Sequence, residues 1–190
     1  MGKTYFTSDP HFGHANVIRY CGRPFANADE MDEALVKNWN AVVGKEDSVY
    51  LLGDVTFRNK AKTLVLLYRL NGKIFLIRGN HDTDVLKEPC VQRFEWVKDM
   101  YLLRVQDAEA PRGFQPIVLC HYPLRTWNLM GHGSWNLHGH CHGSLPPDPN
   151  SRIMDVGVDC TGYAPISYEE VKAFMAKKRF IPVDHHREEM

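Results

Sequence analysis

The chain has 190 residues, of which 44% are hydrophobic and 24% charged, so it has the composition and length of one globular domain spanning residues 1–190. Its 23 basic and 23 acidic side chains give a formal net charge of zero, which argues against a broad basic face and a stable nucleic-acid partner. The sequence has no apolar run of the roughly 20 residues that a membrane-spanning helix needs and no signal-peptide core, so we expect a cytoplasmic protein without a membrane partner.

The first half of the chain alternates predicted strands and helices. Runs rich in β-branched and aromatic residues predict three buried strands, over residues 4–7, 48–52 and 73–77. Apolar residues at helical spacing predict two helices between them, over residues 28–43 and 59–71, with Leu64, Leu67 and Tyr68 on one face of the second. This alternation is typical of parallel strands covered by helices.

The second half has a different pattern. Residues 101–105 and 116–120 flank a polar turn and predict a hairpin, and residues 135–138 and 152–158 predict two further strands. A capping box at Ser167 to Glu170 predicts the start of a helix that runs to about residue 178. We therefore expect two sheets packed together.

Polar side chains follow five of the predicted strands, at the point where each strand ends. They are Asp9 with His11, Asp54, Asn80 with His81 and Asp82, His121, and His140 with His142. Ligands of open α/β sheets bind beyond the carboxyl ends of the strands, so we expect these side chains at one rim. Carboxylate, imidazole and amide groups suit divalent metals, and even seven ligands from this set would suit two ions better than one four-coordinate ion. The five cysteines include no C-x-x-C pair, which disfavours a thiolate zinc site.

Each of these motifs alone has an ordinary structural explanation. Asp-x-His at a strand end is commonly a surface turn, and Gly-Asp commonly begins a helix with the aspartate as its cap. The runs at residues 79–82 and 139–142 are more specific, because buried polar side chains in succession have little structural purpose. All five motifs, in order and each after a strand, favour a metal site over five separate turns.

With these motifs in order, the sequence resembles the calcineurin-like metallophosphoesterase superfamily. The pattern of that family is D-x-H, G-D, G-N-H-D/E, H and G-H-x-H, and every element is present between residues 9 and 142. Residues 9–16, 121–124 and 156–167 also resemble a group of small bacterial and phage phosphoesterases. The resemblance covers nearly the whole chain.

The resemblance implies an α/β fold, a four-layer α/β/β/α sandwich of two mixed β-sheets flanked by helices, with a dinuclear metal site at the strand C-terminal ends. One ion would be held by Asp9, His11, Asp54 and His142, and the other by Asp54, Asn80, His121 and His140, so Asp54 would bridge them. A metal-bridging hydroxide would attack the phosphate, and His81 would be the general acid, with Asp82 orienting the His81 ring. Mn²⁺, Fe, Ni²⁺, Co²⁺ and Zn²⁺ all accept such ligands, and we favour Mn²⁺.

Further residues beside the motifs are candidates for contact with substrate. We single out His14, Arg58 and Arg125, because imidazole and guanidinium groups bind phosphate oxygens. For any one of these arginines, and for Arg23, we expect a solvated surface position more often than a phosphate contact. His138 lies two residues before His140 and is a candidate partner of a metal-binding histidine.

The resemblance implies a metal-dependent phosphoesterase, a hydrolase acting on phosphoric ester bonds. After Asp54 the sequence reads Val55-Thr56-Phe57-Arg58, not the V-D-R-G of protein serine/threonine phosphatases, and 190 residues leave no room for a large cap domain. Both features favour an open site and a phosphodiesterase whose substrate is a small phosphate ester, a nucleotide or an oligonucleotide. A phosphomonoesterase or nucleotide pyrophosphatase using the same site stays open as the alternative. A non-catalytic scaffold is disfavoured by the complete ligand set and by His81. The sequence makes no prediction of oligomeric state.

Overall fold

The first of two sheets carries three of the polar strand ends. In the computed structural model, which describes residues 2–181, this sheet has the strand order β4-β3-β2-β1-β9. Its strands are β1 (Thr4–Thr7), β2 (Ser48–Leu51), β3 (Lys73–Ile77), β4 (Phe94–Lys98) and β9 (Ile166–Ser167). Strands β1 to β4 are parallel and β9 is antiparallel to β1, so the sheet is mixed and the carboxyl ends of β1, β2 and β3 share one edge. The three strands predicted in the first half are confirmed.

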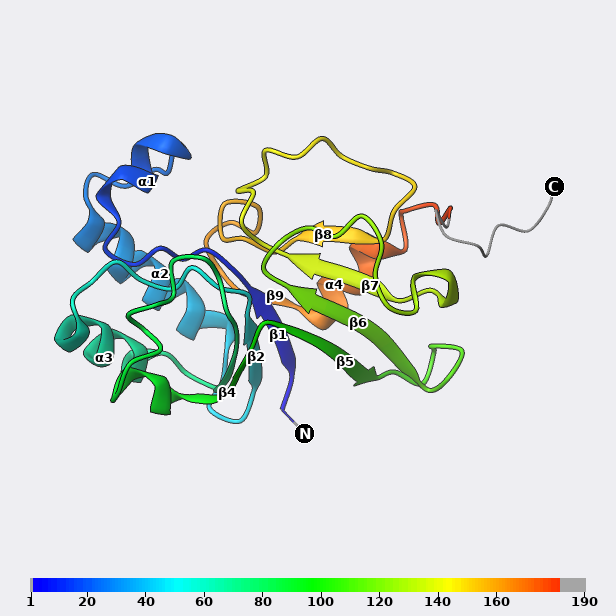
Figure 1. Ribbon diagram of the computed structural model, residues 1–190, viewed down its shortest axis with the longest axis horizontal. Helices are drawn as coiled ribbons and strands as arrows, with labels where there is room; N and C mark the ends of the chain where they lie inside the picture. The colour runs from blue at the N-terminus through cyan, green and yellow to red at the C-terminus, as the bar shows by residue number, and fades with distance from the viewer. Residues whose placement is uncertain (1, 182–190) are drawn as a thin grey trace.

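Three helices pack against this sheet and form one apolar cluster with it: α1 (Ala15–Tyr20), α2 (Ala28–Val42) and α3 (Lys60–Arg69). In Figure 1 they lie on the side of the molecule away from strands β5 to β8. Helix α2 begins as the sequence predicts, because the Asn27 side chain accepts a 2.9 Å hydrogen bond from the backbone N–H of Glu30.

The buried face of α3 differs from the prediction. Leu66 and Leu67 are buried, whereas the Tyr68 side chain is 63% exposed. Leu66, Leu67 and Leu70 form an alternative apolar stripe, with Thr63 also buried, and Tyr68 is left on the exposed side of the helix. Helical spacing therefore predicted the helix correctly but selected the wrong neighbour of Leu67.

The second sheet has the order β5-β6-β7-β8. Strands β5 (Met100–Gln106) and β6 (Phe114–Cys120) form the predicted antiparallel hairpin, and β7 (Trp135–His138) and β8 (Ile153–Asp155) continue it in parallel. The strand expected over residues 152–158 is shorter, because the chain leaves this sheet after Asp155 and Gly157 pairs with Ser8 beyond β1. This crossing carries the residues after β8 to the carboxyl end of β1.

The two sheets share an apolar core. It is formed by Phe6, Leu52 and Ile77 on one side and by Ile117, Leu119 and Leu137 on the other. Helix α4 (Tyr168–Met175), which starts at the predicted capping box, adds Tyr168, Val171 and Met175 to the same cluster. The α/β fold of two mixed sheets flanked by helices is thus confirmed. Within residues 2–181, no helix combines the length and apolar character required to cross a membrane.

Candidate metal centre

Loops that follow β1, β2, β6 and β7 interlock at the shared rim of the two sheets. The backbone N–H of Asp9 donates to the carbonyl of Gly53 at 3.0 Å, and that of His11 donates to the carbonyl of Asp54 at 3.1 Å. Across the sheets, the backbone N–H of His140 donates to Asp9 Oδ2 at 2.8 Å. Residues 131 positions apart are therefore held in direct contact.

Five of the seven predicted ligands adopt a left-handed backbone conformation. The φ angles are 55° at Asp9, 49° at His11, 54° at Asp54, 68° at His140 and 48° at His142. Such conformations at residues other than glycine cost on the order of 1–3 kcal/mol each and persist where the surrounding structure enforces them. Gly139 is required beside them, because a Cβ there would collide with Ser8 Oγ and Asp9 Oδ2. The concentration of strain at one rim is typical of a functional site.

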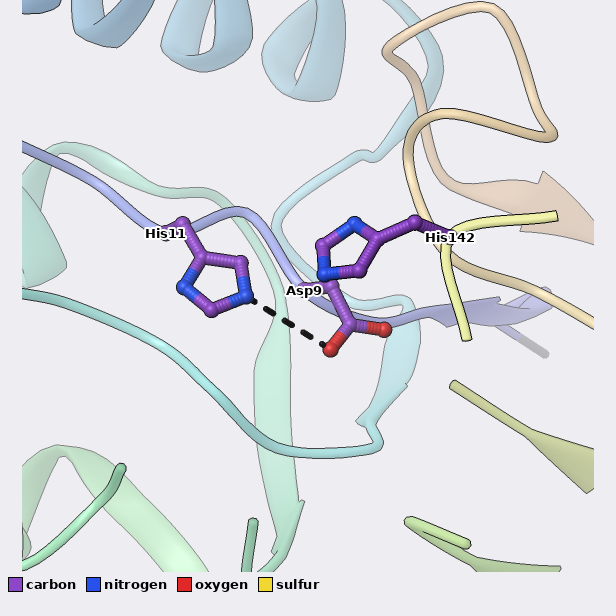
Figure 2. A group of neighbouring side chains, drawn as sticks. All are labelled: Asp9, His11 and His142. Atoms are coloured by element: carbon purple, nitrogen blue, oxygen red, sulfur yellow. Dashed lines mark ion pairs between the residues drawn. The ribbon is translucent and has the colours of Figure 1, made fainter. Parts of the chain in front are cut away.

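The first ligand group contains Asp9, His11 and His142. Figure 2 shows their side chains converging from the segment after β1 and from the loop after β7. Their ligand atoms lie within 4.8 Å of one another, and His11 Nε2 is 3.8 Å from Asp9 Oδ1. The His11 and His142 rings stack with centroids 5.1 Å apart.

The second ligand group contains Asp54, His121 and His140, again with ligand atoms within 4.8 Å of one another. Asp54 Oδ2 lies 3.6 Å from His121 Nε2 and also 3.6 Å from His11 Nε2, so this carboxylate links the two groups. The Asn80 side-chain oxygen lies beside the second group, 3.1 Å from His121 Nε2. The structure thus brings all seven predicted ligands together.

Hydrogen bonds from Nδ1 hold two of the histidines in the form that can bind a cation. His121 Nδ1 lies 2.7 Å from the carbonyl oxygen of Leu52, and His142 Nδ1 lies 2.6 Å from Asp159 Oδ2. Because each acceptor requires the proton on Nδ1, the neutral ring carries its lone pair on Nε2, where a cation could bind.

Buried polar atoms without partners supply the test of whether these residues fit metal ions. Among residues 2–181, Asp9 Oδ1 and both ring nitrogens of His11 are buried and make no hydrogen bond. Burial raises the pKa of Asp9 to about 6, and burial together with the neighbouring His142 lowers the pKa of His11 to about 2. Divalent cations would give these atoms partners and would favour the ionised carboxylate, so the donor set fits such ions.

Arg23 and Asp159 form a support that the sequence did not predict. Arg23 is buried, contrary to the expected surface position, and its Nε and Nη2 donate to the Asp159 carboxylate at 2.8 and 2.7 Å. It also donates to the backbone carbonyls of Asp9 and Pro10, each at 2.9 Å. Burial opposes ionisation of Asp159, but the His142 and Arg23 hydrogen bonds outweigh it and lower the pKa of that carboxyl. The sequence could have indicated this pair only by showing that both charged residues are buried. The two residues are 136 positions apart.

His81 and Asp82 are adjacent in the sequence but have different surroundings. The His81 side chain is exposed at the rim and its backbone N–H donates to Asp54 Oδ1 at 2.9 Å. Asp82 does not orient the His81 ring as expected. Its Oδ2 accepts the backbone N–H groups of Gly79 and Asp54 at 2.7 and 3.1 Å, and its Oδ1 accepts that of Val55 at 2.8 Å. With both oxygens directed at backbone, Asp82 fixes the turns that present Asp54 and Asn80.

The predicted substrate contacts have different surroundings. Arg58 is not free to clamp a phosphate, because its Nε donates to Asp32 Oδ2 at 2.8 Å and its Nη2 pairs with Asp29. Arg125 is exposed and lines a cavity of about 790 Å³ together with His138, whose Nδ1 lies 2.8 Å from the Gly139 carbonyl. His14 is at the rim, with its ring centroid 5.5 Å from that of His11.

Comparisons with known proteins cover both ligand groups. A family model described as calcineurin-like phosphoesterase matches residues 2–163. An uncharacterised protein of Methanocaldococcus jannaschii is 36% identical over 188 residues, which cover 95% of this chain and 96% of the relative. The gene 66 protein of Mycobacterium phage L5 is 30% identical over 186 residues, which cover 85% and 89% of the two chains. Among solved structures, a protein of unknown function from Aquifex aeolicus aligns with a TM-score of 0.67 and 25% identity, covering 92% of this chain and 100% of that chain.

Proposed function

Because the chain belongs to the calcineurin-like phosphoesterase family, we propose that it is a phosphodiesterase whose metal ions are held by the two ligand groups joined through Asp54. Membership makes the chain a metal-dependent hydrolase of phosphoric ester bonds. The observation that carries the proposed metal assignment is that ligand atoms lie on both sides of Asp54, and that Asp9 Oδ1 and the His11 nitrogens are buried without a hydrogen-bond partner among residues 2–181.

In this proposal each ion has four protein ligands. They are Asp9, His11, Asp54 and His142 for one ion, and Asp54, Asn80, His121 and His140 for the other. The two hydrogen-bonded histidines support this division, because His142 offers Nε2 to the first group and His121 offers Nε2 to the second. Mn²⁺ is the first ion to test, since carboxylate and amide oxygens are ligands that it accepts well.

Two divalent ions at this centre would lower the pKa of a water between them and polarise the phosphoryl oxygens. The chain itself contributes the acid. A water oxygen bonds to phosphorus and loses its proton to solvent, the bond from phosphorus to the leaving oxygen breaks, and the His81 imidazolium gives its proton to that oxygen. A phosphodiester would thus yield a phosphomonoester and an alcohol.

The exposure of the rim supports a diester as substrate. His81, Asn80 and His140 are exposed, and the neighbouring Tyr122 and Phe57 side chains are 45% and 43% exposed. A phosphate at such an open rim has room for a substituent on each of two oxygens. A narrow, enclosed site would favour a terminal phosphate instead.

The test compares two nitrophenyl substrates at equal, measured metal content. We expect the Mn²⁺-loaded protein to have a higher kcat/KM for bis(4-nitrophenyl) phosphate than for 4-nitrophenyl phosphate. Asp54→Asn should lose both ions and turnover together, because it removes the shared ligand. Asp107→Asn, which changes a carboxylate far from the rim, is the matched control and should keep both. Full activity of Asp54→Asn would contradict the metal assignment, and a preference for the monoester would contradict the diester assignment alone.

A further inference from the structure

In the part of the chain that the structure describes, the His81 ring is held in place by neighbouring aromatic and imidazole rings and not by hydrogen bonds. Among the described residues, its only polar anchor is the backbone N–H bonded to Asp54 Oδ1, since Asp82 is committed to backbone N–H groups. The ring contacts of His81 are with Phe57, at a centroid distance of 5.0 Å, and with His11, at 6.0 Å. An exposed imidazole that is anchored only through its backbone N–H would otherwise sample several rotamers, because its side-chain bonds can rotate.

Phe57 itself is firmly placed. Its backbone N–H donates to the carbonyl of Phe12 at 2.8 Å, and the preceding Thr56 pairs with Phe12 in an isolated bridge. The Phe57 ring also stacks on His14, with centroids 4.1 Å apart and planes 18° apart. It also stacks on His11 at 5.5 Å. Phe57 is therefore fixed by its backbone and by two histidines, although 43% of it is exposed.

We infer that Phe57 is a positioning residue that holds the His81 ring over the metal centre, the task that the sequence assigned to Asp82. Stacked and tilted ring pairs at these centroid distances are favourable beyond the burial of area alone, which favours one rotamer of His81. An aromatic ring also leaves both nitrogens of His81 free, so the proton is available to a leaving oxygen. The inference rests on the proposed role of His81 as proton donor.

The kinetic test varies the leaving group. For Phe57→Leu we expect a loss of about 10-fold in kcat with an alkyl phosphodiester and little loss with nitrophenyl esters, because nitrophenolate leaves without a proton. Phe57→Tyr should restore the wild-type pattern. His81→Ala should show the same leaving-group dependence more strongly, and the double variant Phe57→Leu/His81→Ala should lose no more than His81→Ala alone, since both act through one ring.

A matched control separates positioning from general packing. Phe75 stacks on Tyr50 at 5.0 Å, away from the rim, so Phe75→Leu should affect stability without any leaving-group dependence. Metal content measured on every variant should stay at the wild-type value for Phe57→Leu. Equal losses for both leaving groups in Phe57→Leu, alongside a leaving-group dependence in His81→Ala, would overturn the inference and leave the proposed function intact.

A readout independent of turnover decides the case in which His81→Ala itself shows no leaving-group dependence. Carbon-13 relaxation of the His81 ring in the metal-free protein should report a lower order parameter in Phe57→Leu than in wild type and Phe57→Tyr. A His81 ring that is as ordered in Phe57→Leu as in wild type would overturn the inference, whatever the kinetics. Lower order together with a flat His81→Ala profile would support positioning by Phe57 and contradict the proton-donor role of the proposed function.

Discussion

At the scale of single residues, Asp9 combines three features that oppose folding of the metal-free chain. It is fully buried, its φ is 55°, and its Oδ1 has no hydrogen-bond partner within residues 2–181. Burial raises its pKa to about 6, so ionisation at neutral pH disfavours the folded state unless a cation is bound. The burial and conformation of Asp9 therefore favour metal binding but destabilise the metal-free folded state.

Asp9→Asn should therefore stabilise the metal-free protein at neutral pH. The folded pKa of Asp9 is above its ordinary value, so the stability linked to its proton is present below about pH 4 and is lost as the pH rises through about 6. As the pH rises over this range, the wild-type protein in chelator should become less stable than Asp9→Asn. The difference in unfolding free energy should reach roughly 3 kcal/mol, because the folded pKa of Asp9 is about two units above its ordinary value. Urea unfolding of both proteins between pH 4 and pH 7 measures the difference. Parallel profiles would contradict the prediction.

The sequence predicted the candidate ligands that the structure brings together at the rim, but not the residues that hold them there. Asp9, Asp54 and His140 were identified because type and spacing are local properties of a strand end. Asp82 was expected to orient His81 but binds backbone N–H groups instead, and Phe57 was assigned no role, because the contacts of both residues depend on how loops distant in the sequence pack together. The same limit explains Arg58, whose carboxylate partners Asp29 and Asp32 lie on α2.

At the scale of elements, the connection between α1 and α2 supports the centre through Arg23. This residue ties the backbone after β1 to Asp159, and Asp159 in turn fixes His142. Lysine cannot reproduce the planar fork that reaches Asp159 and two carbonyls at once. The order of the first ligand group thus depends on a connection that contributes no ligand.

Arg23→Lys should weaken metal binding without changing any ligand. Loss of a hydrogen-bonded partner of a metal-binding histidine typically lowers affinity by about 10–100-fold. Arg23→Lys keeps Asp159, the partner of His142, but loosens its support, so we expect a loss near the lower end of this range for the ion at His142. Arg93→Lys is the matched control, because Arg93 likewise uses its guanidinium to hold backbone, donating to the carbonyls of Leu67, Leu70 and Gly72. Calorimetric titration with Mn²⁺ should show weaker binding for Arg23→Lys only. Equal affinities of the two variants would exclude a supporting role.

Element prediction succeeded where the signal was local. Helix α2 was predicted from its Asn27 cap and its apolar spacing, and both are present. Strand β9 was not predicted, because its two residues become a strand only by pairing with β1. Helix α1, with six residues, is too short for periodicity to indicate it.

At the scale of the whole molecule, the two sheets must keep their relative position for the rim to form, since the candidate ligands come from both sheets. Helix α4 contributes to the core between the sheets and is tied to the end of the β5 strand through Asp107. The Tyr168 hydroxyl donates to Asp107 Oδ2 at 2.6 Å, and Lys172 Nζ lies 2.8 Å from the same oxygen. This contact joins the last helix to the second sheet.

Asp107 should therefore make stability sensitive to acid. The hydrogen bonds from Lys172 and Tyr168 lower its pKa to about 2, so its contribution is present above the ordinary value near 4 and is lost as the pH falls from about 4 to 2. We expect Asp107→Asn to be less stable than wild type at pH 6 and equal to it near pH 2, as measured by thermal unfolding. Glu33→Gln, which breaks the exposed pair with Arg69, is the control and should change stability little at any pH. A difference between Asp107→Asn and wild type that persists undiminished at pH 2 would show that the side chain acts by packing, because most of the stability linked to its charge is lost by then.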